Sequence, residues 1–156
     1  MFLATHTNAV DAKGRVSIPA PFRKQLSPRE ELILYRLSDQ PVFHACTQAH
    51  FETLEPALLH SNLDASEREV MRFVLYAQAQ YVSYDKEGRF SVPDDVRKTL
   101  GNPKQICFVG LGNEFQLWHP DQFAKHHTKL IALAKKPEFN PNALLAQALQ
   151  TPGVKG

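Results

Sequence analysis

The chain has 156 residues, of which 43% are hydrophobic, so it can bury a core as one medium-sized domain or as two small ones. Its formal net charge of +2 excludes a uniformly basic surface, so any contact with nucleic acid has to come from a local patch. The N-terminus does not have the pattern of a secretory signal, and no apolar run approaches the roughly 18 residues of a membrane span. We therefore expect a cytoplasmic protein that does not enter a membrane.

A nine-residue segment near the N-terminus recurs 74 residues further along the chain. Residues 11–19 read DAKGRVSIP and residues 85–93 read DKEGRFSVP, and the same offset carries Arg23 and Lys24 onto Arg97 and Lys98. Such self-similarity indicates a duplicated structural unit. We predict a first copy at 5–51, a helical connector at 52–79, a second copy at 80–124, and a C-terminal helix and tail at 125–156.

The first four residues of each repeated segment have the composition of a tight turn. Asp suits the first position of a type I turn, and Gly suits the fourth, where a positive φ lets the chain rejoin a strand. Apolar and polar residues then alternate, which places Arg15 and Ser17 together on an outer face. The residues for which we predict a structural role in the turns are Asp11, Gly14, Asp85 and Gly88.

The remaining elements follow from patterning in chain order. After the first turn comes a short helix containing Phe22, then strands at 32–37 and 42–45 and helices at 47–59 and 64–76. A second short helix is expected between Pro93 and Gly101, followed by strands at 106–111 and 115–118 and a helix at 120–136. Thr47 and Asp64 suit the N-caps of the two middle helices. The last stretch, 137–156, is typical of a poorly ordered tail or of a docking segment.

Cations gather unevenly around the two copies of the motif. In the first copy four cations stand against one acid, a local charge of +3, whereas in the second copy four cations face four acids. Because a phosphate backbone is attracted by local positive charge, we predict that the first copy dominates contact with DNA. The residues predicted to bind DNA are Lys13, Arg15, Arg23, Lys24 and Arg89. Copies of this size bury little surface alone, so they should pack against each other or against other subunits.

Each predicted DNA contact also has a plainer interpretation. Arg15 and Arg89 can each form an exposed ion pair with the Asp four residues earlier, or they can reach bases and phosphates. Lys13, Arg23 and Lys24 can be ordinary solvated surface charges. The sequence leaves both interpretations open.

Other function classes have weaker support. The seven histidines do not have the spacing of a metal or acid–base site, and the HExxH, GxSxG and GKS/T motifs are absent. We therefore expect no enzymatic activity, metal, cofactor or small-molecule substrate. Cys46 and Cys107 stand in separate apolar segments and should be buried thiols.

A protein-interaction scaffold or antitoxin-like module is the main alternative, because the segments 70–76 and 144–149 are strongly apolar. A role in RNA binding has less support, since the aromatic residues Phe2, Phe22 and Phe43 occupy positions typical of a core and not of a stacking surface.

The segments MFLATHTNAVDAKGRVSIPAPFR, SYDKEGRFSVPDDVRKTLG and VGLGNEFQLWHPDQF resemble the bacterial MraZ family, the two-copy member of the swapped-hairpin AbrB-like superfamily. The resemblance runs from Met1 to about Lys125, and its hallmark is the doubled Asp-x-x-x-Arg motif. It implies an α+β fold of two tandem swapped-hairpin units, assembled into a ring-like homo-oligomer.

The resemblance also implies a function. Members of this family are transcriptional regulators, and for this chain we expect a repressor of the division and cell-wall gene cluster. It would bind short direct repeats of double-stranded DNA in its own promoter region and associate with the nucleoid. The DNA contacts would fall on Lys13 and Arg15, and on Arg89 if the second copy participates.

Overall fold

The computed structural model describes residues 1–28 and 31–150, and the chain divides into a larger unit, Met1–Pro120, and a C-terminal unit from Asp121 onward. The larger unit holds a six-stranded sheet and a separate two-stranded ribbon, and every strand pair is antiparallel. With several helices beside the sheet, the predicted α+β class is confirmed.

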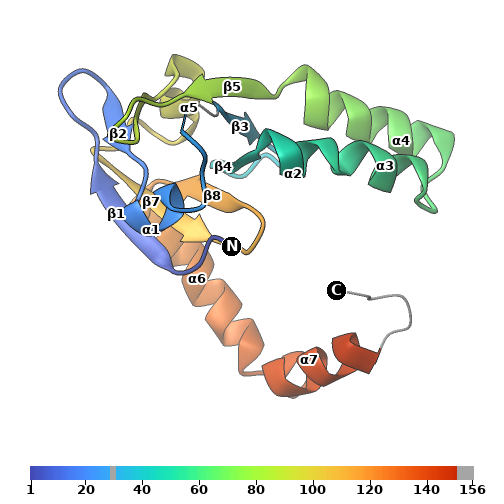
Figure 1. Cartoon of the computed structure of the whole chain (residues 1–156). Coiled ribbons are helices and arrows are strands. Elements are labelled where there is room, and N and C mark those ends of the chain that lie inside the picture. Colours follow the sequence, from blue (N-terminus) through green and yellow to red (C-terminus); the bar gives the residue numbers. More distant parts are fainter. Residues whose placement is uncertain (29–30, 151–156) are drawn as a thin grey trace. The chain divides into compact units, whose positions relative to one another are not determined.

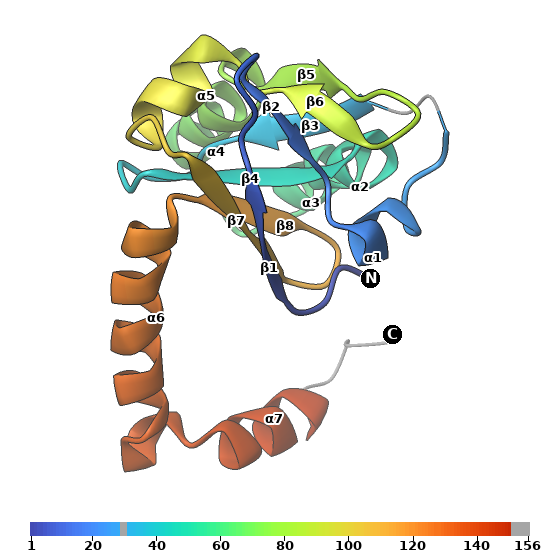
Figure 2. The same cartoon turned by 90° about the vertical axis from the view of Figure 1, so that its left-hand side faces the viewer.

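The strands predicted at 32–37, 42–45, 106–111 and 115–118 are all present, within a few residues of those bounds, in the sheet of the larger unit. Figure 2 shows this sheet. The sheet has the order β1 (Thr5–Ala9), β7 (Gln105–Gly110), β8 (Phe115–Trp118), β4 (Val42–Thr47), β3 (Glu31–Tyr35) and β5 (Gln80–Ser83). The ribbon consists of β2 (Arg15–Ser17) and β6 (Arg89–Ser91).

The two copies of the repeat exchange strands. The first strand of the first copy, β1, pairs with β7 of the second copy, while β5 of the second copy pairs with β3 of the first. Between them β2 pairs with β6, with Val16 opposite Phe90. Two matching hydrogen bonds extend the ribbon, from the N–H of Ile18 to the carbonyl of Gly88 and from the N–H of Val92 to that of Gly14. The copies therefore pack on each other as one interlocked unit.

The main core lies between the ribbon and the sheet. Val16, Ile18, Phe90 and Val92 on the inner face of the ribbon are at most 6% exposed. Phe22 packs against Phe2 and Phe115 at centroid distances of 5.4 and 5.1 Å. Full burial of one such side chain contributes about 1.5–3 kcal/mol, so this core fixes the position of the ribbon and of its outer face.

The expected helix at 47–59 is two helices, α2 (Gln48–Glu52) and α3 (Leu54–Leu59), so the prediction of one helix was wrong. Pro56 has no N–H to donate to the carbonyl four residues earlier. In addition, the Thr53 hydroxyl donates a hydrogen bond to the carbonyl of His50 at 2.6 Å, which competes with the helical pattern. The predicted N-cap Thr47 is confirmed, since its hydroxyl accepts a hydrogen bond from the N–H of His50.

The predicted helix at 64–76 is α4 (Ala65–Arg72), which continues as the π-helical turn η1 (Phe73–Ala77). Asp64 and Glu67 form the expected capping box, with hydrogen bonds of 2.8 and 3.0 Å. Of its apolar residues Leu75 is buried, whereas Val70 and Phe73 are 60% and 63% exposed. Helices α3 and α4 pack on each other at the end of the larger unit away from β2 (Figure 1).

Two short helices complete the larger unit. They are α1 (Ala20–Arg23) and α5 (Asp94–Thr99), and each follows one strand of the ribbon. The C-terminal unit contains α6 (Pro120–Ala134), η2 (Pro137–Phe139) and α7 (Pro141–Gln150).

Residues 141–150, in the segment for which the sequence left a poorly ordered tail or a docking segment open, are helical, because Ala, Leu and Gln favour a helix and the Asn140 side chain caps it. The rest of the predicted tail, 151–156, lies outside the described residues. In the described part of the chain, no helix is long and apolar enough to cross a membrane.

Candidate nucleic-acid interface

The first repeated turn is held by the side chain of Asp11. Its Oδ1 accepts hydrogen bonds from the backbone N–H groups of Lys13 and Arg15 at 2.9 and 2.8 Å, and its Oδ2 accepts one from Arg15 Nε at 2.9 Å. Gly14 is at φ +78°, and its N–H donates to the carbonyl of Asp11. Asp11 and Gly14 therefore lie at the positions that close this turn, where the sequence predicts a structural role.

The second turn repeats this arrangement closely. Asp85 Oδ1 accepts hydrogen bonds from the N–H groups of Glu87 and Arg89, both at 2.9 Å, and Oδ2 accepts one from Arg89 Nε at 3.0 Å. Gly88 is at φ +75°. The spacing of the Asp-x-x-x-Arg motif is therefore set by a turn in which the carboxylate binds both the backbone and the side chain of the arginine.

These hydrogen bonds change the acidity of both turns. The backbone N–H of Arg15, the side chain of Arg15 and the N–H of Lys13 lower the pKa of Asp11 in spite of partial desolvation. The corresponding bonds, with the N–H of Arg89 as the largest, lower the pKa of Asp85. Both carboxylates are therefore ionised at neutral pH and hold their arginines in place.

The outer face of the ribbon carries two arginines and two serines. Arg15 lies opposite Ser91, and Ser17 lies opposite Arg89, so all four share one face while Val16 and Phe90 occupy the other. The side chains of Arg15 and Arg89 are 32% and 37% exposed. A two-stranded ribbon has the width that the major groove of DNA admits, and arginine is well suited to bind guanine edges and phosphates.

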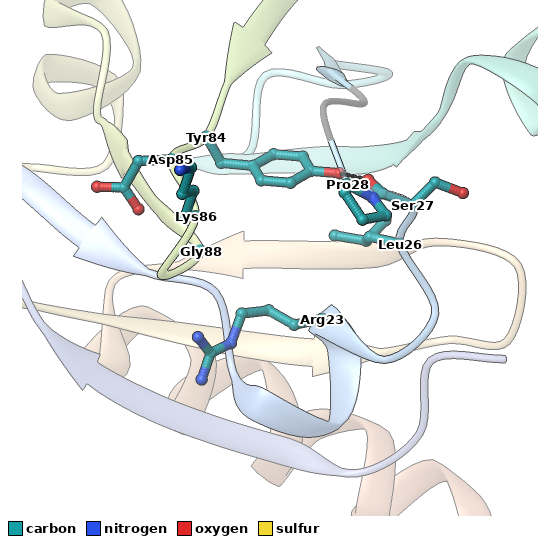
Figure 3. Close-up of a pocket in the computed structure, with 8 residues that line it drawn as sticks. All are labelled: Arg23, Leu26, Ser27, Pro28, Tyr84, Asp85, Lys86 and Gly88. Carbon is teal, nitrogen blue, oxygen red and sulfur yellow. Dashed lines mark hydrogen bonds between the residues drawn. The ribbon is translucent and has the colours of Figure 1, made fainter.

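Arg23 lies with the second turn and not with the first. Its Nη1 donates a hydrogen bond of 2.5 Å to the carbonyl of Glu87. Figure 3 shows its side chain passing beneath Gly88, where a Cβ atom would lie only 2.1 Å from Arg23 Cδ. At the other end of the ribbon the equivalent residue, Arg97, has Nη1 3.1 Å from the Cβ position of Gly14.

Each short helix lies against the turn of the other copy, so the charged residues around each turn differ from those that the sequence grouped there. The first turn with α5 combines four cations and three acids, a net charge of +1, and the second turn with Arg23 and Lys24 combines four cations and two acids, a net charge of +2. The sequence argument assumed that each copy keeps its own cations, and that assumption was wrong.

The predicted lysines lie on the surface. Lys13 in the first turn and Lys24 after α1 are exposed. Lys86 lines a pocket of about 640 Å³ between the two copies, together with Arg23 and Tyr84, whose hydroxyl donates to the carbonyl of Ser27 at 2.7 Å (Figure 3). The structure thus brings the second turn and the end of α1 together, which the sequence alone did not indicate.

A second polar cluster was not found from the sequence. His44 Nδ1 lies 3.1 Å from Glu114 Oε1, the Tyr35 hydroxyl donates to the same carboxylate, and the Tyr35 and His44 side chains stack at 5.0 Å. Burial would raise the pKa of Glu114, but the hydrogen bonds from His44 and Tyr35 outweigh it and lower that pKa. The pairing of β3 with β4 places Tyr35 opposite His44, and the pairing of β4 with β8 brings Glu114 beside them.

The thiol beside this cluster is held in its protonated form. Desolvation, with a smaller contribution from the Glu114 charge, raises the pKa of Cys46 to about 12, so the thiol stays protonated at neutral pH. Cys46 and Cys107 are both buried and free, as predicted.

Comparison with known proteins places the chain in a family. A family model described as "MraZ protein, putative antitoxin-like" matches residues 1–70 and 75–143. The chain belongs to the MraZ family. The MraZ proteins that it resembles include one from Gluconobacter oxydans, 35% identical with 92% of this chain and 94% of the relative covered. Another, from Gluconacetobacter diazotrophicus, is 40% identical over 77% and 79%, and one from Rickettsia akari is 31% identical over 89% and 95%. These MraZ relatives are all named transcriptional regulators.

Proposed function

We propose that this protein is a transcriptional regulator that binds double-stranded DNA through the outer face of the β2–β6 ribbon. The observation that carries this proposal is the pairing of the two motif strands, with Arg15 and Arg89 diagonally across from each other on the outer face of the ribbon. Lys13, Arg23 and Lys24 add positive charge on either side of it. The relatives' names support the regulatory role.

We further propose a repressor that acts as an oligomer. One ribbon with a few cations should bind DNA in the non-specific range, with a Kd of roughly 10⁻⁴ to 10⁻⁶ M at physiological salt. A ring-like homo-oligomer of two-copy swapped-hairpin subunits would present several ribbons to several direct repeats, and effective concentration would raise the overall affinity. The proposed targets are promoter repeats of its own division and cell-wall gene cluster, within the cytoplasm and nucleoid.

A protein-interaction scaffold is the second candidate, and the exposed apolar side chains favour it. Val70 and Phe73 are more than half exposed on the α4–η1 segment, and Leu145 and Leu149 are similarly exposed on α7. In the DNA-binding proposal such surfaces are covered by neighbouring subunits. Light scattering, combined with binding of a hydrophobic dye, distinguishes the two: a regulator ring should be oligomeric and bind little dye.

The experiment that tests the main proposal is fluorescence anisotropy with the duplex upstream of this protein's own gene and with a scrambled duplex, across a salt series. Tighter binding to the natural duplex, with log K falling steeply against log salt concentration, is the expected result. If neither duplex binds below micromolar concentrations at low salt, the arginines serve the turns alone and the scaffold candidate replaces the regulator.

A further inference from the structure

A polar pocket of about 450 Å³ lies beside the ribbon in the first copy, between β1, β2 and α1. Its polar lining consists of His6, Asn8, Ser17 and Arg23. The Nε2 atom of His6 and the Nε atom of Arg23 are buried and have no hydrogen-bond partner among the described residues. A buried polar group without a partner is unfavourable, so a ligand that forms hydrogen bonds with these side chains would stabilise them.

The equivalent place in the second copy shows what chemistry satisfies these positions. At the offset of 74 residues, His6 corresponds to Gln80 and Arg23 to Arg97. Gln80 Nε2 donates to Asp95 Oδ2 at 2.9 Å, and Arg97 Nη2 pairs with Asp94 Oδ1 at 2.5 Å. Two carboxylates therefore serve as the partners of these side chains.

The first copy has no such carboxylates. The residues at the positions of Asp94 and Asp95 are Ala20 and Pro21, both of which line the pocket. Among the described residues that line it, none is acidic, while a guanidinium, an imidazole, an amide and a hydroxyl are present. His6 is held in position by edge-on packing against Phe22 at 5.3 Å.

We propose that this pocket binds a phosphate-type oxyanion, which takes the hydrogen-bonding role that the two aspartates have in the second copy. Arginine, histidine, amide and hydroxyl groups are the donors that typically bind phosphate oxygens. The group can come from inorganic phosphate or from a DNA phosphodiester, because Ser17 in the pocket lies opposite Arg89 on the ribbon. The second source rests on the proposed function, whereas anion binding itself does not.

The test follows the His6 imidazole signals of the full-length protein by NMR while inorganic phosphate replaces chloride at constant ionic strength. The wild type should show a saturable shift and a higher Tm. The signal shift and the rise of Tm should both be lost in Ala20→Asp/Pro21→Asp, which introduces the two carboxylates found in the second copy. They should also be lost in Ala20→Asp alone, which keeps the proline of α1. The reciprocal variant, Asp94→Ala/Asp95→Pro, should show a larger rise of Tm with phosphate than the wild type; Tm is the readout here because Gln80 stands in the place of His6. An unresponsive wild type, or an Ala20→Asp variant that responds like the wild type, overturns the proposal.

Replacing chloride with phosphate during a DNA titration shows whether the group in the pocket comes from DNA or from free phosphate. If phosphate weakens DNA binding by the wild type and not by Ala20→Asp, a DNA phosphodiester occupies the pocket. If DNA binding is unchanged while His6 still responds, the ligand is free phosphate. A protein that binds phosphate and no DNA at all would overturn the proposed function and leave the pocket assigned.

Discussion

The two motif turns share one backbone design and differ in how firmly each holds its arginine. Arg15 pairs with one carboxylate, that of Asp11. Arg89 pairs with two, because the position of Lys13 in the first turn is occupied by Glu87 in the second, and Glu87 Oε2 lies 2.5 Å from Arg89 Nη2. The duplicated motif therefore presents one arginine with a single carboxylate partner and one arginine with two.

The comparison also shows that local net charge does not favour the first turn in the folded chain. Once α1 and α5 are placed, the second turn is no less positive than the first. What distinguishes the turns is the immediate partner of each arginine, Glu87 in particular. The prediction that the first copy dominates DNA binding stays a prediction, now for a different physical reason.

The largest expected effect is on stability and separates the two turn glycines. Gly88→Ala should cost about 2–4 kcal/mol, because an alanine at φ +75° is strained and its Cβ would displace Arg23. Gly14→Ala should cost only about 1–2 kcal/mol, since its nearest neighbour, Arg97 Nη1, is 3.1 Å away. Urea unfolding measures both. In an Arg23→Ala background the difference between the two glycines should disappear, and equal costs in the wild-type background would contradict the role given to Arg23.

The next effect is on DNA affinity. Arg15→Ala should weaken binding to the promoter duplex by about tenfold to hundredfold, the range for loss of one arginine contact with a base. Arg89→Ala should weaken it less, because part of that arginine's interaction is with Glu87. Anisotropy titration checks both, and Arg68→Ala on the distant helix α4 is the matched control. An equal loss in the two motif variants would show that the copies bind DNA alike.

A smaller effect is expected from exchanging the residues that distinguish the turns. Glu87→Lys should free Arg89 and add a cation, which steepens the slope of log K against log salt by about 1, and Lys13→Glu should reduce the slope by a similar amount. Both variants should keep the oligomeric state of the wild type. A Glu87→Lys variant with unchanged salt dependence would place the second turn outside the DNA interface.

The smallest effect is acid weakening of the turns. The folded-state pKa values of Asp11 and Asp85 lie below the ordinary value of 3.8, so their contribution to stability is complete above that pH and is lost as the pH falls through the lowered values. Unfolding free energies measured between neutral pH and about pH 3 should therefore decline only at the acidic end. Asp11→Asn/Asp85→Asn should flatten that decline, and a variant with the wild-type pH profile would show that other carboxylates cause it.

Much of the local structure could be predicted from the sequence. The turns at Asp11–Gly14 and Asp85–Gly88, the caps at Thr47 and Asp64, and the alternation around Val16 depend on neighbours within a few residues, which the chain itself supplies. The break at Thr53 was missed although Pro56 signals it. By contrast, the Tyr35–His44–Glu114 cluster joins Glu114 to residues that lie 79 and 70 positions earlier, and no local pattern indicates it.

The sequence by itself determined that the chain is a duplicated, β-rich protein with an arginine at the end of each motif turn, because turn chemistry and alternation act over short distances. Only the tertiary structure decided which turn each cation serves. The exchange of strands between the copies carries Arg23 to the turn of Glu87 and Gly88, and carries Arg97 to that of Gly14. Such pairing is set by burial of the shared core, and its effect on the charged surface emerges only when both copies fold together.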